Sequence, residues 1–194
     1  MILVFATANQ HKVQEAQAIL GPNIRLVLPA DLGFVQEIPE TGYTLEENAM
    51  QKARTIWNAF GQDCFADDTG LEVFALDGAP GVYSARYAGN QANAQDNIAK
   101  LLAQLKEKED RRAQFRCVIA LILKGKEYLF EGSVSGTIIE TPQGAKGFGY
   151  DPVFVPLGYD QSFALMEGEV KNAISHRKRA LEQLATFLKT PVIH

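Results

Sequence analysis

The segment ILVFATANQHKVQEAQAILGPNIRLVL, residues 2–28, indicates the fold class. It opens with an unbroken apolar run, which is typical of a strand covered on both faces. Residues 12–20 then place apolar side chains at helical spacing, and the Gly-Pro pair that follows ends the helix. Residues 24–28 read as a second short strand. The order strand, helix, strand predicts an α/β fold.

The rest of the chain continues to alternate between helices and strands. Thr44 and Glu47 have capping-box spacing, and the apolar face that follows predicts a helix up to Gly61. Residues 63–67 read as a strand that ends in an aspartate pair. We expect a loop at 77–90 and a helix at 94–107. Strands are expected within 114–140, joined by a turn at 124–126. A loop and a short strand within 144–156 and one helix over 172–189 follow. We therefore expect a mixed sheet with helices on its faces and two lobes around a cleft.

The composition is that of a globular protein without extreme charge. Hydrophobic residues make up 46% of the 194 residues, and the net charge of −4 argues against a nucleic-acid polymer or an anionic membrane as partner. Cys64 and Cys117 lie far apart among apolar neighbours, so we expect buried free thiols. The first apolar run is too short for a signal peptide, and no stretch reaches bilayer length. We expect a cytoplasmic enzyme.

Asp67 and Asp68 are adjacent carboxylates, which are costly to bury without partners. Because side chains alternate along a strand, the two should point in different directions, and only one should face a cleft. The aspartate that faces the cleft either binds a metal ion or a water molecule, or it belongs to an Asx turn with Gly70. Glu40 offers a second carboxylate, and Mg²⁺ needs only one or two besides substrate phosphates. The plainer interpretation of Glu40 is an exposed loop glutamate.

Two loops carry side chains suited to a nucleotide. TANQHK, residues 7–12, leads into the first helix, where backbone N–H groups suit phosphate. Thr7 and Asn9 add donors and Lys12 adds charge, although a helix cap with a solvated lysine explains the same residues. GFGYDP, residues 147–152, carries two aromatic residues that either stack on a nucleobase or anchor the core.

The sequence SHRKR, residues 175–179, crowds the start of the final helix, with Lys171 just upstream. Cations are unfavourable at a helix N-terminus. The cluster therefore indicates an anion or an acceptor-rich ligand nearby, with Lys178 and Arg179 as a solvated basic face. His176 is not accompanied by a CxxC or HExxH motif, so we do not interpret it as a metal ligand.

Six segments in this order resemble the inosine triphosphate pyrophosphatase family: TANQHK, ETGYTLEENAMQKA, ADDTGLEV, APGVYSARYAG, GFGYDPVF and KNAISHR. The resemblance runs from about residue 3 to residue 188. It implies an elongated α/β fold with a mixed central sheet flanked by helices and two lobes around an active-site cleft, formed by a single domain over residues 1–194. It also implies Mg²⁺-dependent hydrolysis of ITP, dITP and XTP to the monophosphate and pyrophosphate, by a homodimer.

The resemblance also assigns roles to individual residues. Asp68 is the expected catalytic residue, Glu40 and Asp68 are the expected metal ligands, and water would attack the α-phosphorus. Because a carboxylate bound directly to a metal is a poor base, activation of water and metal binding are competing roles for Asp68. The expected substrate-binding residues are Thr7, Ala8, Asn9, Gln10, His11, Lys12, Lys52, Thr69, Phe148, Gly149, Tyr150, Asp151, Lys171, His176 and Arg177. Of these, Thr7, Asn9, Lys12 and Lys52 fall where the family holds the triphosphate, and Thr69 falls beside the metal and phosphates. Residues 148–151, with Lys171, His176 and Arg177, fall where it holds the nucleoside and base.

The expected base pocket has a chemical logic. Groups of His176, Arg177 and the backbone would donate hydrogen bonds to the 6-carbonyl of hypoxanthine or xanthine, whereas they would face another donor in the 6-amino group of adenine. Two small departures from the family pattern are Ala8, where glycine is frequent, and Thr69, where serine is frequent. Asp67 would brace its turn or support its neighbour, and Lys52 read alone is a solvated helix lysine. A pyrophosphatase for modified pyrimidine or methylated substrates and a nucleotide-binding sensor are the alternatives.

Overall fold

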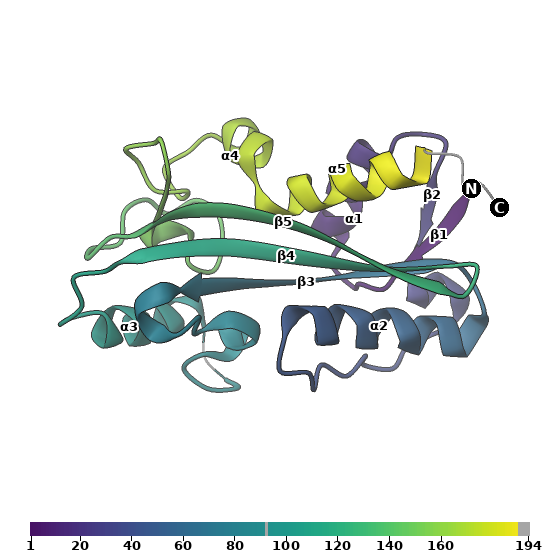
Figure 1. The fold of residues 1–194 in the computed structure, drawn as a ribbon, viewed down its shortest axis with the longest axis horizontal. Helices are drawn as coiled ribbons and strands as arrows, with labels where there is room; N and C mark the ends of the chain where they lie inside the picture. The colour runs from purple at the N-terminus through teal and green to yellow at the C-terminus, as the bar shows by residue number, and fades with distance from the viewer. Residues whose placement is uncertain (92, 190–194) are drawn as a thin grey trace. The chain divides into compact units, whose positions relative to one another are not determined.

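The computed structural model describes residues 1–91 and 93–189 (Figure 1). The strands are β1 (Ile2–Phe5), β2 (Arg25–Val27), β3 (Cys64–Val73), β4 (Arg112–Leu123), β5 (Lys126–Ile138) and β6 (Phe154–Pro156). The α-helices are α1 (Gln10–Leu20), α2 (Leu45–Phe60), α3 (Ala94–Gln104), α4 (Gly168–Ile174) and α5 (His176–Lys189). Short 3₁₀ turns lie at 29–32, 74–76, 81–86 and 151–153. None of the helices within the described ranges is both long and apolar enough to cross a bilayer.

The strands of the described residues form one mixed sheet in the order β2-β1-β3-β4-β5-β6. Strand β1 pairs in parallel with β2 and β3, whereas β5 and β6 are antiparallel. Strands β4 and β5 follow each other through Lys124 and Gly125, both with positive φ, as a two-residue hairpin turn requires. The predicted mixed sheet flanked by helices is confirmed, and the cleft between two lobes stays a prediction.

The chain divides into two compact units. The first unit comprises Met1–Asp68, Cys117–Gly132 and the chain from Arg177 onward. The second comprises Thr69–Arg116 and Ser133–His176. Strands β3, β4 and β5 each contribute residues to both units. The expectation of a single domain over 1–194 stays a prediction, and its last five residues lie outside the described ranges.

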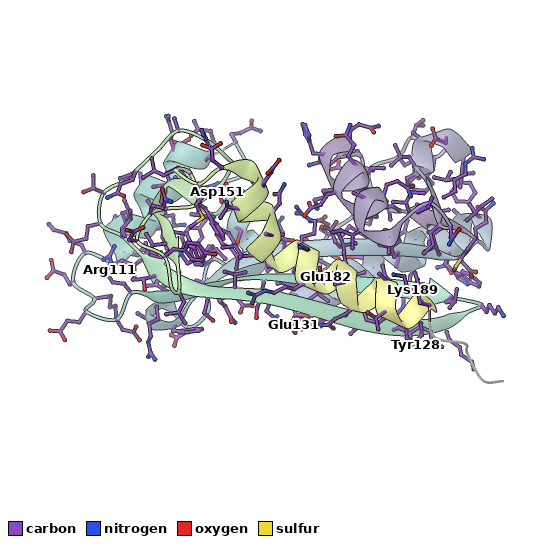
Figure 2. The ribbon with its side chains drawn as sticks, turned by 90° about the horizontal axis from the view of Figure 1, so that it is seen from above. Arg111, Tyr128, Glu131, Asp151, Glu182 and Lys189 are labelled. Atoms are coloured by element: carbon purple, nitrogen blue, oxygen red, sulfur yellow. The ribbon has the colours of Figure 1, made fainter. Side chains whose placement is uncertain are left out.

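In the first unit, helices cover both faces of the strands (Figure 1). Side chains alternate along β1 and β3, so Phe5 and Phe65 share one face, where their rings stack with centroids 4.2 Å apart. Helices α1 and α5 pack on this face and build one apolar core with it. On the other face lies α2, where the Cys64 thiol donates to the carbonyl of Ala53 at 3.2 Å. Figure 2 shows Tyr128 near the end of α5, where it packs on Phe187.

The second unit has its own apolar core. Helix α3 contributes Ile98, Leu101 and Leu105 to it, and the loops around β6 contribute aromatic side chains such as Phe154 and Phe163. The rings of these two phenylalanines lie 5.1 Å apart. This core fixes the loop that leads into β6, which is the loop that carries the predicted nucleoside-binding residues.

Three predictions about elements were wrong in part. Strand β3 does not end at the aspartate pair but continues to Val73, so Asp67 and Asp68 lie inside a strand and no Asx turn forms there. The final helix is two helices, because the backbone of Ser175 is extended between α4 and α5. Helix α3 ends at Gln104, before the expected residue 107.

Candidate active site

Strand β3 sends its two aspartates to opposite faces, as the alternation of side chains predicts. Asp67 shares a face with Phe65 and meets side chains of α1 and α5. Asp68 meets side chains of α2 on the other face. Asp67 is 2% exposed, whereas the side chain of Asp68 is 13% exposed. The two neighbouring carboxylates therefore belong to two separate clusters within the first unit.

The cluster around Asp67 contains two cations and a second carboxylate. Lys12 Nζ donates to Asp67 Oδ1 at 2.9 Å, and Arg177 Nε donates to Asp67 Oδ2 at 3.2 Å. Arg177 Nη1 also donates to Glu15 Oε2 at 3.3 Å. Burial opposes ionisation of Asp67, but Lys12, Arg177 and Lys52 outweigh it and hold the pKa of that carboxyl well below its usual range. Asp67 is thus an ionised, fully paired buried carboxylate.

The cluster around Asp68 centres on the ammonium group of Lys52. Lys52 Nζ donates to Glu40 Oε1 at 2.6 Å and to Asp68 Oδ1 at 3.2 Å, while Asn48 Nδ2 donates to Asp68 Oδ2 at 3.3 Å. Burial raises the pKa of Asp68, and the charge of Lys52 opposes that rise. Lys52 is 6% exposed, so its interpretation as a solvated lysine was wrong. Glu40 has a 37% exposed side chain but is held in place by this lysine.

These contacts bear on whether a divalent cation fits. Carboxylate oxygens of Glu40 and Asp68, from a loop and a strand, already converge on one cationic group. Mg²⁺ takes oxygen ligands and commonly uses one or two carboxylates plus substrate phosphates. Nowhere in the described ranges do three or more His, Cys, Asp or Glu side chains gather as metal ligands. The residues therefore suit a cation completed by a phosphate ligand rather than a closed protein cage.

The first turn of α1 positions the segment expected to bind phosphate. Asn9 is the N-cap of the helix, and its Oδ1 accepts from the backbone N–H groups of His11 and Lys12 at 3.0 and 3.3 Å. Thr7 Oγ1 accepts from the N–H of Asn9 at 3.1 Å. The segment therefore forms the helix cap that the sequence indicated. The interpretation of Lys12 as a solvated lysine was wrong, because Lys12 pairs with Asp67. The neighbours Ala8, Gln10 and His11 are exposed.

In the second unit, Asp151 organises the loop expected to bind the nucleoside. Asp151 is 3% exposed and accepts from the N–H of Phe148 at 2.7 Å and from Lys171 Nζ at 2.5 Å. Figure 2 shows Asp151 beside α4, the helix that carries Lys171. The same ammonium lies 4.7 Å from the ring centroid of Phe148, which is 65% exposed. Phe148 therefore presents a ring that a nucleobase can stack on, braced by a cation.

The two aromatic residues of this loop have different roles. Tyr150 is 3% exposed, and its hydroxyl donates to the carbonyl of Ser84 at 2.9 Å. Burial raises the pKa of Tyr150. Gly149 between them has a φ of 58°, a conformation that favours glycine. Tyr150 is therefore a core anchor, whereas Phe148 has an exposed ring, and stacking of a nucleobase on that ring stays a prediction.

His176 and Thr69 are the remaining predicted residues of the second unit. His176 is buried, and its ring stacks on Phe115 with centroids 5.1 Å apart. Thr69 follows Asp68 in β3, and its Oγ1 is buried and makes no hydrogen bond within the described structure. A buried hydroxyl of this kind is available to a ligand.

The basic start of α5 is explained differently from the prediction. Arg177 is neutralised by carboxylates of the protein, Asp67 and Glu15, rather than requiring an external anion. Lys178 pairs with Glu182 one turn later at 3.6 Å, and Arg179 is exposed, as expected of a solvated face. Arg177 shares Asp67 with Lys12, which the resemblance assigns to the triphosphate, whereas the resemblance assigns Arg177 to the base.

Asn48 and Glu15 are contact residues that the sequence interpretation missed. Asn48 is fully buried and lies four residues before Lys52, on the same face of α2. A polar residue on the apolar face of an amphipathic helix was the available signal. Glu15 gave no signal, because its partner Arg177 lies 162 residues away in the chain.

Comparison with known proteins gives one consistent result. The profile of the Ham1 family matches residues 3–187. A protein of Christiangramia forsetii named dITP/XTP pyrophosphatase is 53% identical over 97% of this chain and 99% of its own length. A protein of Flavobacterium johnsoniae with the same name is 50% identical over 97% and 98%.

Solved structures agree with the sequence comparison. The Staphylococcus aureus Ham1 protein has a TM-score of 0.92 at 41% identity, covering 97% of this chain and 98% of that one. A HAM1 protein from Coxiella burnetii has a TM-score of 0.93 at 40% identity with the same coverage. The resemblance inferred from six short motifs is confirmed, and the chain belongs to the Ham1 family.

Proposed function

We propose that this chain hydrolyses non-standard purine nucleoside triphosphates, namely ITP, dITP and XTP, to the nucleoside monophosphate and pyrophosphate. The observation that carries the proposal is the convergence of Glu40 and Asp68 on Lys52. The names of the relatives, dITP/XTP pyrophosphatase, support the choice of substrates and reaction. Removal of non-standard nucleotides from the pool would prevent their incorporation into nucleic acid.

The triphosphate would be held by the residues of the first unit. Lys12 and Lys52 supply positive charge, and the turn from Thr7 to Lys12 supplies polar groups beside a helix N-terminus. Both lysines are oriented by carboxylates, so little reorganisation is needed when the phosphates bind. Lys12 would neutralise charge that the bound triphosphate already carries, and Lys52 would neutralise the charge that develops on the departing pyrophosphate.

Glu40 and Asp68 would hold Mg²⁺, the cofactor that the resemblance implies. When bound, the ion would supply charge neutralisation for the phosphate oxygens. Asp68 has two oxygens in different surroundings, with Oδ1 toward Lys52 and Oδ2 toward Asn48. Asp68 would serve either as a ligand of the cation or as the group that orients the attacking water and receives its proton, because a carboxylate bound directly to a metal is a poor base. Asn48 holds this carboxylate through its hydrogen bond to Oδ2.

The nucleoside would be held by the second unit. Phe148 offers a stacking surface, Asp151 and Lys171 fix the loop that carries it, and His176 lies next to Arg177 in sequence at the start of α5. Preference for a 6-carbonyl over a 6-amino group would follow from donor groups in this region, because a donor facing a donor leaves a buried group unpaired. The homodimer and the cytoplasmic location stay predictions.

Product analysis tests the proposal. ITP is incubated with Mg²⁺ or with EDTA, and pyrophosphate, orthophosphate and IMP are quantified. We expect equal amounts of IMP and pyrophosphate with Mg²⁺ and none with EDTA. Asp68→Asn should lower kcat by about 100-fold or more, because it removes the carboxylate that would bind the cation or deprotonate the attacking water. The matched control is Asp160→Asn, an exposed aspartate. Release of orthophosphate, or full activity in Asp68→Asn, would refute the proposal.

A further inference from the structure

Asp67 links two cations that come from distant parts of the chain. Its Oδ1 accepts from Lys12 in the first turn of α1, and its Oδ2 accepts from Arg177 in the first turn of α5. The separations along the sequence are 55 and 110 residues. One carboxylate, set in β3 directly before Asp68, therefore fixes side chains from two helices that pack on one face of the strands.

Burial excludes a direct catalytic role for Asp67. The residue is 2% exposed, and each oxygen is occupied by a cationic donor. The side chain of Lys12 is 23% exposed, so that lysine remains accessible to a ligand. Charge-assisted hydrogen bonds hold both partners in a defined geometry. Asp67 can therefore affect a ligand only through the groups that it holds.

We propose that Asp67 is a positioning residue that holds Lys12 in place for the triphosphate and couples it to Arg177. The proposal deepens the proposed function and rests on it for the identity of the substrate. Because Lys12 would contact the phosphates equally before and during the reaction, loss of its position should weaken binding more than it slows chemistry.

The first variant is Asp67→Asn, which keeps the shape and removes the charge. An amide presents an NH₂ group to one of the two cations, so one of the two hydrogen bonds is lost and replaced by repulsion. We expect KM for ITP to rise by about tenfold, with kcat within about threefold of the wild-type value. A purely structural role would instead reduce the active fraction, which lowers apparent kcat and leaves KM unchanged.

Binding of inorganic tripolyphosphate, measured by calorimetry without turnover, is the second readout. Its Kd should rise by about the same factor as KM in Asp67→Asn. The matched control is Glu15→Gln, which removes the other carboxylate on Arg177 but leaves the contact between Lys12 and Asp67 intact. That control should change the tripolyphosphate Kd by no more than about twofold.

If Asp67→Asn does not fold, Asp67→Glu takes its place, since it keeps the charge and moves the carboxylate by one methylene. A rise in KM of about threefold is then expected. A folded Asp67 variant with unchanged KM and tripolyphosphate Kd would overturn the inference. Tighter tripolyphosphate binding would overturn it too, because Asp67 would then only be damping the charge of Lys12. A wild-type protein that binds tripolyphosphate but hydrolyses no nucleotide would refute the proposed function and leave the binding test of Asp67 intact.

Discussion

Lys52→Met is the substitution whose consequences follow most directly from the structure. Lys52 Nζ lies 2.6 Å from Glu40 Oε1 and 3.2 Å from Asp68 Oδ1, and the residue is 6% exposed. Methionine has a similar length but no charge, so the two carboxylates would face each other without a cation. Loss of one partner from a buried ion pair costs about 3–5 kcal/mol. Because the side chain of Glu40 is 37% exposed and can be hydrated, we expect about 2–3 kcal/mol here.

Thermal unfolding in EDTA measures this cost. For a chain of this size, about 2–3 kcal/mol corresponds to a Tm lower by about 4–12 °C. Adding Mg²⁺ should restore stability in the variant more than in the wild type, because the ammonium group no longer competes for the oxygens of Glu40 and Asp68. At a Mg²⁺ concentration of about 100 times Kd, the recovery should approach about 2.7 kcal/mol.

Lys12→Met is the matched control, because Lys12 pairs with Asp67 and touches neither Glu40 nor Asp68. It removes one positive charge from the same unit without freeing the expected metal ligands. Its response to Mg²⁺ should resemble that of the wild type. A Lys52→Met protein with wild-type Tm in EDTA, or with no larger response to Mg²⁺ than the control, would refute this account of the cluster.

Three further predictions concern stability and reactivity. Gly70→Ala should lower the free energy of unfolding by about 1–3 kcal/mol in urea titration, because its Cβ would overlap the carbonyl oxygen of Gly81; an unchanged urea midpoint would contradict this. The low pKa of Asp67 stabilises the fold at pH values above about 3.9, the pKa of an aspartate in an unfolded chain. The difference in the free energy of unfolding between wild type and Asp67→Asn should therefore shrink as the pH falls below about 4, and a constant difference would count against this prediction. Burial raises the pKa of Cys64 to about 12, so this thiol should resist a disulfide reagent at pH 8 until the protein unfolds, and rapid labelling of the native thiol would show otherwise.

Much of the fold followed from local patterns. The apolar run before α1 and the Thr44 cap before α2 placed the first strand and the long helix correctly. The end of β3 could not be predicted, because the two aspartates and Gly70 have weak strand preference and only pairing with neighbouring strands overrides it. The break between α4 and α5 at Ser175 had no proline or glycine to announce it.

The types of residue at the site could be predicted from the sequence, but the ion pairs and hydrogen bonds that join them could not. The alternation of β3 correctly separated the directions of Asp67 and Asp68. The partners of these aspartates come from elements brought together by packing, and no local pattern links Arg177 to Asp67 across 110 residues. The basic cluster of α5 therefore suggested an external anion, whereas the fold supplies an internal one.

Steady-state kinetics on a panel of nucleotides would test whether the protein hydrolyses non-standard purine nucleotides selectively. We would measure kcat/KM for pyrophosphate release from ITP, XTP, dITP, ATP and GTP with Mg²⁺. We expect the values for the first three to exceed those for ATP and GTP by about 100-fold or more. Equal values for all five would contradict the base selection, and no release from any would contradict the hydrolase itself.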